Sequence, residues 1–173
     1  MKDIEKFENF LTEEEFEIVH EDAWRNIRSR KDSEYLASFQ TNYTLWDKSI
    51  IHKSSVVLIT HINNAVVKNI LDNKIFNAFN KTPLSYMYYY WTNGSYIPWH
   101  DDGHQGSAAT LYMNCEWDKD WGGYYMYESN ESEIKAVKPE KNLFILQHNH
   151  TPHCVTPVIQ GSPHRVSIQM FFS

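Results

Sequence analysis

The chain has 173 residues, 42% of them hydrophobic and 15% aromatic, so it is long enough to bury a core as one domain without disulfide or metal staples. Its net charge of −6, with no run of Lys or Arg, excludes the electrostatic footprint of a nucleic-acid-binding protein. No apolar run approaches the roughly 20 residues that span a bilayer, and the N-terminal segment MKDIEKFENF is too charged for a signal peptide. With Cys115 and Cys154 far apart in the sequence, we expect a cytoplasmic protein with reduced thiols and no membrane partner.

The first half of the chain is predicted to be helical. In LTEEEFEIVHEDAWRNIRSR (residues 11–30), Thr12 and Glu15 form a capping box at the start of a helix. An apolar stripe at helical spacing follows, at Phe16, Val19, Ala23 and Ile27. Residues 29–50 have weak periodicity and are expected to be mostly loop. SSVVLITHINNAVVKNILDN (residues 54–73) predicts a second helix, with one side formed by Val56, Ile59, Asn63, Val66 and Ile70.

From Pro83 onward the pattern changes to short β-prone runs separated by turn residues. The expected strands lie at residues 84–91, 108–114, 122–128, 133–138, 142–147 and 165–172. Helices followed by strands indicate an α+β domain over residues 1–173, with helical support at about 1–80 and a sheet sandwich or barrel at about 83–173.

The segment SYIPWHDDGH (residues 95–104) is the first candidate for chemistry. If it is extended, His100 and Asp102 point the same way, because alternate residues of a strand share a face. One further imidazole would complete a two-His, one-carboxylate set, which is the donor set of non-haem Fe(II) oxygenases. The alternative is a solvated loop with charges at its tip.

A second cluster, QHNHTPHCVTPV (residues 147–158), offers His148, His150 and His153 directly after a hydrophobic run. These histidines could instead satisfy backbone carbonyls in a polar loop. Zinc is a further alternative, with Cys115 or Cys154 as a thiolate ligand. Zinc is the weaker reading, because the cysteines lack paired spacing and His153 and Cys154 would point to opposite faces of a strand.

The last predicted strand, RVSIQMFF (residues 165–172), has one polar and one apolar face. Its polar face consists of Arg165, Ser167 and Gln169. The same alternation in ATLYMN (residues 109–114) gives a polar face of Thr110, Tyr112 and Asn114. An arginine fork in a cavity can hold a carboxylate through two hydrogen bonds, with a hydroxyl beside it. The alternative is two ordinary amphipathic strands whose polar faces lie in water.

In order and spacing, these pieces resemble the Fe(II)- and 2-oxoglutarate-dependent dioxygenases, and among them the prolyl 4-hydroxylase branch. The resemblance runs from about Tyr86 to Phe172. It rests on four segments: YYYWTNGSYIPWHDDG, LYMNCEWDKDWGGYYMYE, VKPEKNLFILQHNHTPHCVTPV and HRVSIQMFF. It implies a double-stranded β-helix, a jelly-roll or cupin-like barrel, backed by the N-terminal helices.

The resemblance also implies a ligand set and cosubstrates. Fe(II) would be held by His100, Asp102 and His153, with His150 as the fallback for the third ligand. The cosubstrates would be 2-oxoglutarate and O2, with ascorbate as the reductant in vitro.

The cosubstrate pocket follows from the same resemblance. Arg165 matches the residue that pairs the far carboxylate of 2-oxoglutarate, with Ser167 beside it, and Tyr112 matches a residue that hydrogen-bonds the same carboxylate. Tyr90 matches a further pocket tyrosine. Many relatives carry Tyr-x-x-Gly before the His-x-Asp motif, whereas WTNG places Trp91 there.

The substrate implied by the branch is a peptidyl proline, hydroxylated with release of succinate and CO2. A groove for an extended peptide is expected at Trp99, Trp117 and Trp121, with residues 29–50, including Tyr43 and Trp46, as a lid. The alternatives are core packing of the tryptophans, the same chemistry on a small molecule or a non-proline residue, and a non-catalytic binding domain on the same fold.

Overall fold

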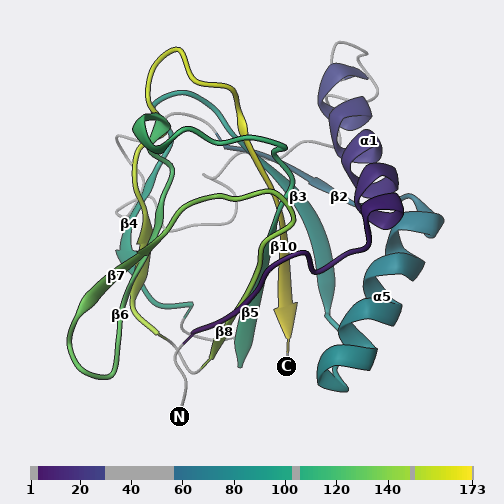
Figure 1. Ribbon diagram of the computed structural model, residues 1–173, viewed down its shortest axis with the longest axis horizontal. Coiled ribbons are helices and arrows are strands. Elements are labelled where there is room, and N and C mark those ends of the chain that lie inside the picture. The colour runs from purple at the N-terminus through teal and green to yellow at the C-terminus, as the bar shows by residue number, and fades with distance from the viewer. Residues whose placement is uncertain (1–3, 30–56, 103–105, 149–150, 173) are drawn as a thin grey trace.

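The computed structural model describes residues 4–29, 57–102, 106–148 and 151–172 (Figure 1). Apart from Ser29, the predicted lid with Tyr43 and Trp46 lies outside the described residues, as does the fallback ligand His150. Among the described residues, no helix combines the length and the apolar composition needed to cross a bilayer.

Two antiparallel sheets form the body of the molecule. The six-stranded sheet has the order β1-β8-β5-β10-β3-β2. Its strands are β1 (Ile4–Phe7), β2 (Val57–His61), β3 (Ser85–Trp91), β5 (Ser107–Tyr112), β8 (Phe144–His148) and β10 (Arg165–Phe172). The four-stranded sheet has the order β4-β9-β6-β7. Its strands are β4 (Ile97–His100), β6 (Tyr125–Glu128), β7 (Ile134–Val137) and β9 (His153–Val155).

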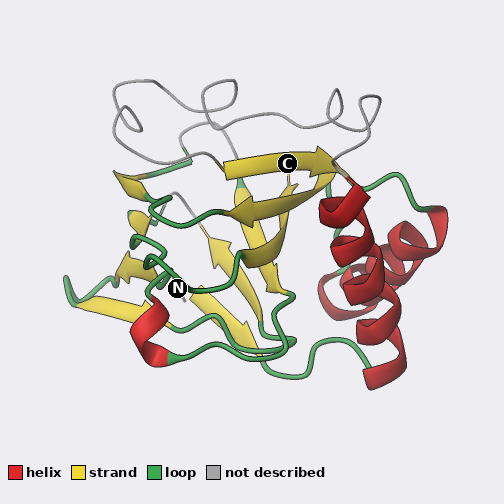
Figure 2. Ribbon diagram, turned by 90° about the horizontal axis from the view of Figure 1, so that it is seen from above, coloured by secondary structure: helices red, strands yellow, loops and turns green. Residues whose placement is uncertain are grey.

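The helices cover one face of the six-stranded sheet, and the four-stranded sheet lies across its other face (Figures 1 and 2). They are α1 (Glu13–Ser29) and α5 (Ala65–Phe79), and a short 3-10 helix, η1 (Lys119–Trp121), precedes β6. The predicted α+β class, with strands in two facing sheets and helices behind one of them, is confirmed.

Helix α1 begins as its sequence predicts. The Glu15 amide donates to Thr12 Oγ1 at 3.3 Å, and the Thr12 amide donates to Glu15 Oε2 at 2.8 Å. This capping box satisfies two of the amides that a helix start leaves without partners. The predicted stripe is buried in full, at Phe16, Val19, Ala23 and Ile27.

The second predicted helix is wrong in its first part. Residues 57–61 form β2, and α5 begins only at Ala65, where the Asn64 side chain caps the helix by accepting from the Val66 amide. Val66, predicted to be on the inner side, is 58% exposed, and the buried side consists of Val67, Leu71 and Ile75. A short apolar run fits a strand or a helix equally well, and pairing with β3 decides this one.

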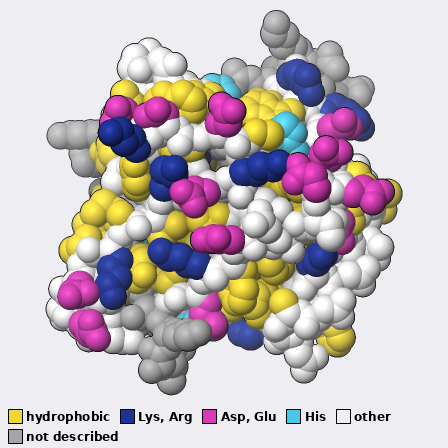
Figure 3. Space-filling model, viewed as in Figure 1, with side chains coloured by type: hydrophobic (Ala, Val, Ile, Leu, Met, Phe, Trp, Pro, Cys, Tyr) yellow, Lys and Arg dark blue, Asp and Glu magenta, His cyan; other side chains and the backbone are white. Residues whose placement is uncertain are grey.

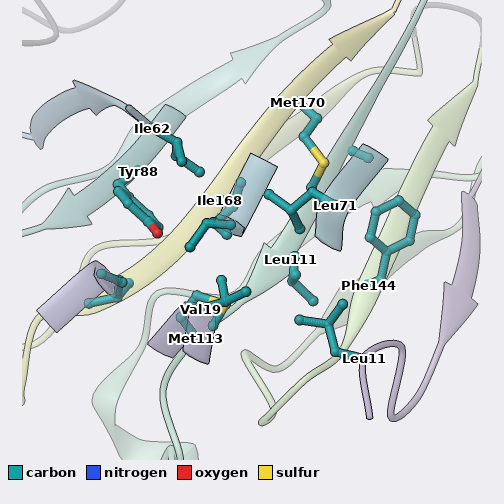
Figure 4. Packing of buried hydrophobic residues seen from close by; sticks show 14 of the residues in the cluster. Leu11, Val19, Ile62, Leu71, Tyr88, Leu111, Met113, Phe144, Ile168 and Met170 are labelled. Atoms are coloured by element: carbon teal, nitrogen blue, oxygen red, sulfur yellow. The ribbon is translucent and has the colours of Figure 1, made fainter. Parts of the chain in front are cut away.

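Two hydrophobic clusters divide the interior. One lies between the helices and the six-stranded sheet and includes Phe144, Ile168 and Met170 (Figure 4). The other lies between the two sheets and is rich in aromatic residues. Strand β10 contributes Val166, Ile168 and Met170 to the first cluster, as its alternation predicts. On the face shown in Figure 3, acidic and basic side chains are interspersed.

A buried asparagine ties the segment before α1 to the turn before β8. Asn142 has a φ of 56°, and its side chain donates to the Leu11 carbonyl at 2.8 Å and accepts from the Leu11 amide at 2.9 Å. Replacing Asn142 with Ala should lower the free energy of unfolding by about 2–4 kcal/mol, because both buried backbone groups lose their partner and Ala resists a positive φ. Urea denaturation measures the change.

The matched control is Asn142→Gly, which removes the same two hydrogen bonds but accepts the positive φ. It should unfold at a urea concentration between those of the wild type and the Ala variant. An Ala variant as stable as the wild type would show that the asparagine contributes nothing to this junction.

Candidate active site

Strand pairing brings the three predicted metal ligands together. His100 ends β4 and His153 begins β9, and the two residues are directly opposite each other in the antiparallel pair. Asp102 follows His100 by two residues and lies beside both. The candidate donor atoms of the three side chains all lie within 4.8 Å of one another.

Both imidazoles are held in the form that a metal needs. His100 Nδ1 lies 2.8 Å from the Pro98 carbonyl oxygen, and His153 Nδ1 lies 2.8 Å from the Thr151 carbonyl oxygen. A carbonyl only accepts, so each Nδ1 donates its hydrogen there, which leaves Nε2 as the ring nitrogen available to a metal. The two Nε2 atoms are 3.8 and 3.9 Å from the Asp102 oxygens, too far for hydrogen bonds.

The donor set fits a divalent ion such as Fe(II). Burial, and then the nearby His100, lower the pKa of His153 below its ordinary value and so favour the neutral, ligating form. Among the described residues no thiol belongs to the cluster, since Cys115 is exposed with its Sγ 3.5 Å from His20 Nε2. Two imidazoles and one carboxylate therefore favour a non-haem iron site over a zinc–thiolate site.

The ligands line a pocket between the two sheets. Aromatic, aliphatic and polar side chains from both sheets form the rest of its wall: Tyr89, Trp91, Ile97, Thr110, Tyr125, Gln147, Val155, Arg165, Gln169 and Phe171.

Arg165 is the most unusual of these residues. Its side chain is 1% exposed, and its guanidinium carbon lies 4.9 Å from the centre of the Trp91 ring and 5.0 Å from that of Tyr112. Nη2 makes one long contact of 3.4 Å with the Tyr112 hydroxyl, while Nε and Nη1 have no hydrogen-bond partner among the described residues. A buried cation without a counter-ion is unfavourable. The position therefore suits an anionic ligand.

Polar side chains of β5 and β10 lie near this arginine. In the strand register Ser167 lies opposite Tyr112, and its buried hydroxyl also has no partner among the described residues. Asn114 fixes the start of β10, since its side chain donates to the His164 carbonyl at 2.9 Å and accepts from the Val166 amide at 2.7 Å. The structure thus places Arg165, Tyr112 and Ser167 together.

The predicted pocket role of Tyr90 is wrong. Its hydroxyl donates to the Ala23 carbonyl at 2.8 Å, and its ring belongs to the cluster under the helices. Residues of β3 alternate between the faces, so Tyr89 and Trp91 line the pocket instead. Because SYMYYYW is aromatic on both faces, its pattern gives no signal for which face is which.

The predicted groove of three tryptophans is not formed. Trp117 is buried between the sheets, and its Nε1 donates to the Gly122 carbonyl at 2.9 Å. Trp121 packs edge-on against Trp117 and lines a different hollow, beside α1. Only Trp99, next to His100 on β4, is largely exposed, at 45%.

Sequence reasoning missed two further pocket residues, Tyr125 and Gln147. In the segment QHNH the histidines were the candidates for chemistry, but Gln147 is the residue that lines the pocket. His148 does not line it, and its Nε2 lies 2.9 Å from Glu5 Oε1. The alternation of β8 was the available signal, since Ile145 and Gln147 share the inner face.

Gly123 gives Arg165 its space. Its φ is 64°, and a Cβ there would lie 2.9 Å from Arg165 Cδ and 3.3 Å from Trp117 Cζ2. Gly123→Ala should therefore displace the arginine and weaken binding of an anionic ligand by about 1–3 kcal/mol, the usual range for overpacking. Isothermal titration with 2-oxoglutarate measures the loss.

Gly161→Ala is the control, because Gly161 also has a positive φ, 89°, but no atom lies within 4 Å of the added Cβ. It should lower stability without changing the affinity. Equal losses of affinity in the two variants would mean that backbone strain, not the crowding of Arg165, is responsible.

Comparisons with known proteins identify the family of the chain. The model of the 2OG-Fe(II) oxygenase superfamily matches residues 84–173. No curated protein matches the chain.

Solved structures with the same fold include three prolyl hydroxylases. The Pseudomonas putida prolyl-4-hydroxylase has a TM-score of 0.72 and 15% identity, over 99% of this chain and 92% of that one. A Trichoplax adhaerens prolyl hydroxylase, in complex with a hypoxia inducible factor oxygen degradation domain peptide fragment, has a TM-score of 0.75 and 16% identity, over 98% and 83%. The viral collagen prolyl hydroxylase of Paramecium Bursaria Chlorella virus-1, in a 2OG complex, has a TM-score of 0.68 and 16% identity, over 98% and 95%.

At these identities the likeness establishes the double-stranded β-helix, which confirms the predicted fold. The family model covers the segment that holds the paired histidines, Asp102 and the buried arginine. The chain belongs to the 2OG-Fe(II) oxygenase superfamily.

Proposed function

We propose that this oxygenase hydroxylates an unactivated C–H bond of a peptidyl proline, using Fe(II), 2-oxoglutarate and O2 and releasing succinate and CO2. The observation that carries the cosubstrate assignment is Arg165, a buried guanidinium with no counter-ion among the described residues, in the same pocket as three converging metal donors. A dicarboxylate that chelates a metal with one end and needs a cation at the other suits both features.

Each residue then has a defined task. His100, Asp102 and His153 would hold the iron. Arg165, Ser167 and Tyr112 bind the far carboxylate of 2-oxoglutarate. When bound, the iron supplies the oxidising chemistry, and the protein supplies position and a dry cavity.

The pocket wall supports this assignment electrostatically. The rings of Trp91 and Tyr112 both contact the Arg165 guanidinium, and Tyr89 and Phe171 add apolar surface. Hydrogen bonds to a charged group are stronger where water is excluded. The same wall holds the cosubstrate in one orientation relative to the metal donors.

The assignment to proline is the finer part of the proposal. Its support is the order of the motifs and the likeness to three structures whose names describe prolyl hydroxylases. Trp99, exposed beside His100, is the residue that we propose contacts an extended peptide near the iron. The second candidate is the same chemistry on a small molecule or another residue type.

The test uses the purified protein with Fe(II), 2-oxoglutarate, O2 and ascorbate, and measures succinate together with the mass of proline-containing peptides. A gain of one oxygen on proline, absent from the matching peptides with alanine in its place, supports the proposal. Succinate without oxidation of any proline would favour the small-molecule alternative. Failure of the wild type to bind 2-oxoglutarate or form succinate would contradict the cosubstrate assignment.

A further inference from the structure

Two buried polar residues outside the ligand set contact two of the ligands. Tyr125 on β6 donates its hydroxyl hydrogen to Gln147 Oε1 on β8 at 2.7 Å. Gln147 Nε2 donates to Asp102 Oδ2 at 3.4 Å, and the Tyr125 ring stacks on the His153 ring with centres 5.2 Å apart. We infer that the Tyr125–Gln147 pair positions Asp102 and His153 for metal binding, an inference that rests on the metal site of the proposed function.

The orientation of the Gln147 amide follows from its surroundings. Its nitrogen faces two groups that only accept, the Asp102 carboxylate at 3.4 Å and the Thr151 carbonyl at 3.5 Å. If the amide were flipped, its oxygen would face both acceptors. The Tyr125 hydroxyl, which donates to the amide oxygen, stabilises the orientation in which the nitrogen points to Asp102.

This arrangement restricts the carboxylate. With Oδ2 held by Gln147, Asp102 cannot rotate freely about its last bond, and Oδ1 remains available beside His100 Nε2. At 3.4 Å the hydrogen bond is long, so we expect it to orient the carboxylate more than to attract it. Groups of this kind normally determine how tightly a metal is bound.

The same pair also contacts the surroundings of His153. The Thr151 carbonyl that accepts from His153 Nδ1 accepts from Gln147 as well, and the Tyr125 ring lies at 24° to the imidazole. Strands β6 and β8 belong to different sheets. The Tyr125–Gln147 hydrogen bond therefore joins the two sheets next to the metal donors and links the placement of both ligands.

The experiment measures metal affinity directly, by anaerobic titration with Co(II) and its visible absorption, without turnover. Gln147→Leu keeps the approximate size of the side chain and removes its three hydrogen bonds, to Tyr125, Asp102 and Thr151, so Co(II) affinity should fall about 10–100-fold and the absorption bands should shift. Tyr125→Phe keeps the ring on His153 and should cause a smaller loss. The double variant should bind no more weakly than Gln147→Leu within about twofold, because the tyrosine hydroxyl acts through the glutamine.

Tyr88→Phe is the matched control. It also removes a buried tyrosine hydroxyl, one that donates to Asp22 Oδ2 at 2.8 Å on the helix side of the sheet. It should lower stability in urea as Tyr125→Phe does, yet leave the Co(II) affinity and spectrum unchanged. This separates the loss of a buried hydrogen bond from the loss of ligand positioning.

The outcomes distinguish the inference from the function on which it rests. If the wild type bound no Co(II), the metal site itself would be refuted and the inference with it. If the wild type bound Co(II) and Gln147→Leu had the same affinity and spectrum, only the inference would be overturned. Fully additive losses in the double variant would show that Tyr125 does not act through Gln147.

Discussion

An Asp102→Ala variant should lose metal binding and form no succinate. Asp102 supplies the only carboxylate among the three converging side chains, and without it two imidazoles remain. Loss of the anionic ligand should weaken Fe(II) or Co(II) binding by more than about 100-fold, the upper limit for residues that only support a ligand. Anaerobic metal titration and a succinate assay measure the two effects.

The neighbouring aspartate provides the control. Asp101 is exposed, one residue earlier in the chain, and does not belong to the cluster of donors. Asp101→Ala changes the net charge of this segment by the same amount and should leave metal affinity close to that of the wild type. Equal losses in both variants would indicate a general electrostatic attraction of cations, and a functional Asp102→Ala enzyme would refute the ligand set.

Arg165→Met should produce a protein that is more stable without cosubstrate and unable to bind it. Replacing a buried charge that has no counter-ion in the part of the chain that the structure describes with an apolar side chain of similar length should raise the free energy of unfolding by about 1–4 kcal/mol. The same change removes the charge-assisted hydrogen bonds to a carboxylate, about 1.5–3 kcal/mol for each bond. Metal binding should persist, because the ligands lie at the end of β4, two residues beyond it and at the start of β9, away from β10.

Urea denaturation with and without 2-oxoglutarate measures both effects. A concentration of 100 times Kd should stabilise the metal-loaded wild type by about 2.7 kcal/mol and the variant not at all. Arg25→Met, at an exposed arginine on α1, should shift stability by no more than about 0.5 kcal/mol and keep the full response. A variant that still responds to 2-oxoglutarate would show that Arg165 is not its anchor.

Local signals in the sequence predicted those parts of the fold that depend on near neighbours. The capping box at Thr12 and the stripe of α1 are formed as expected, and the alternation of β10 separates Arg165 from the apolar face. The start of α5 was misplaced, because the preference of residues 57–61 for a strand comes from pairing with β3, which is distant from it in the chain.

The site was predictable to a similar extent. The spacing of His100 and Asp102 gave two ligands, but the choice of His153 rested on resemblance, because the register of β4 against β9 cannot be derived from either segment alone. The pocket role predicted for Tyr90 is wrong for a different reason, because a strand that is aromatic on both faces carries no marker of its inner face. Gln147 and Tyr125 contact each other across the two sheets, and nothing local in either segment relates them.

The central strand β10 has the proposed chemistry on one face and the helix-side core on the other. Because alternate residues of a strand share a face, both roles depend on the same register. Insertion or deletion of one residue at the start of the strand would turn Arg165 toward the hydrophobic cluster beneath α1 and α5 and bring Val166 into the pocket. Side chains can therefore be exchanged within one face of the strand, whereas a change in its length by one residue would disrupt the pocket and the helix-side core together.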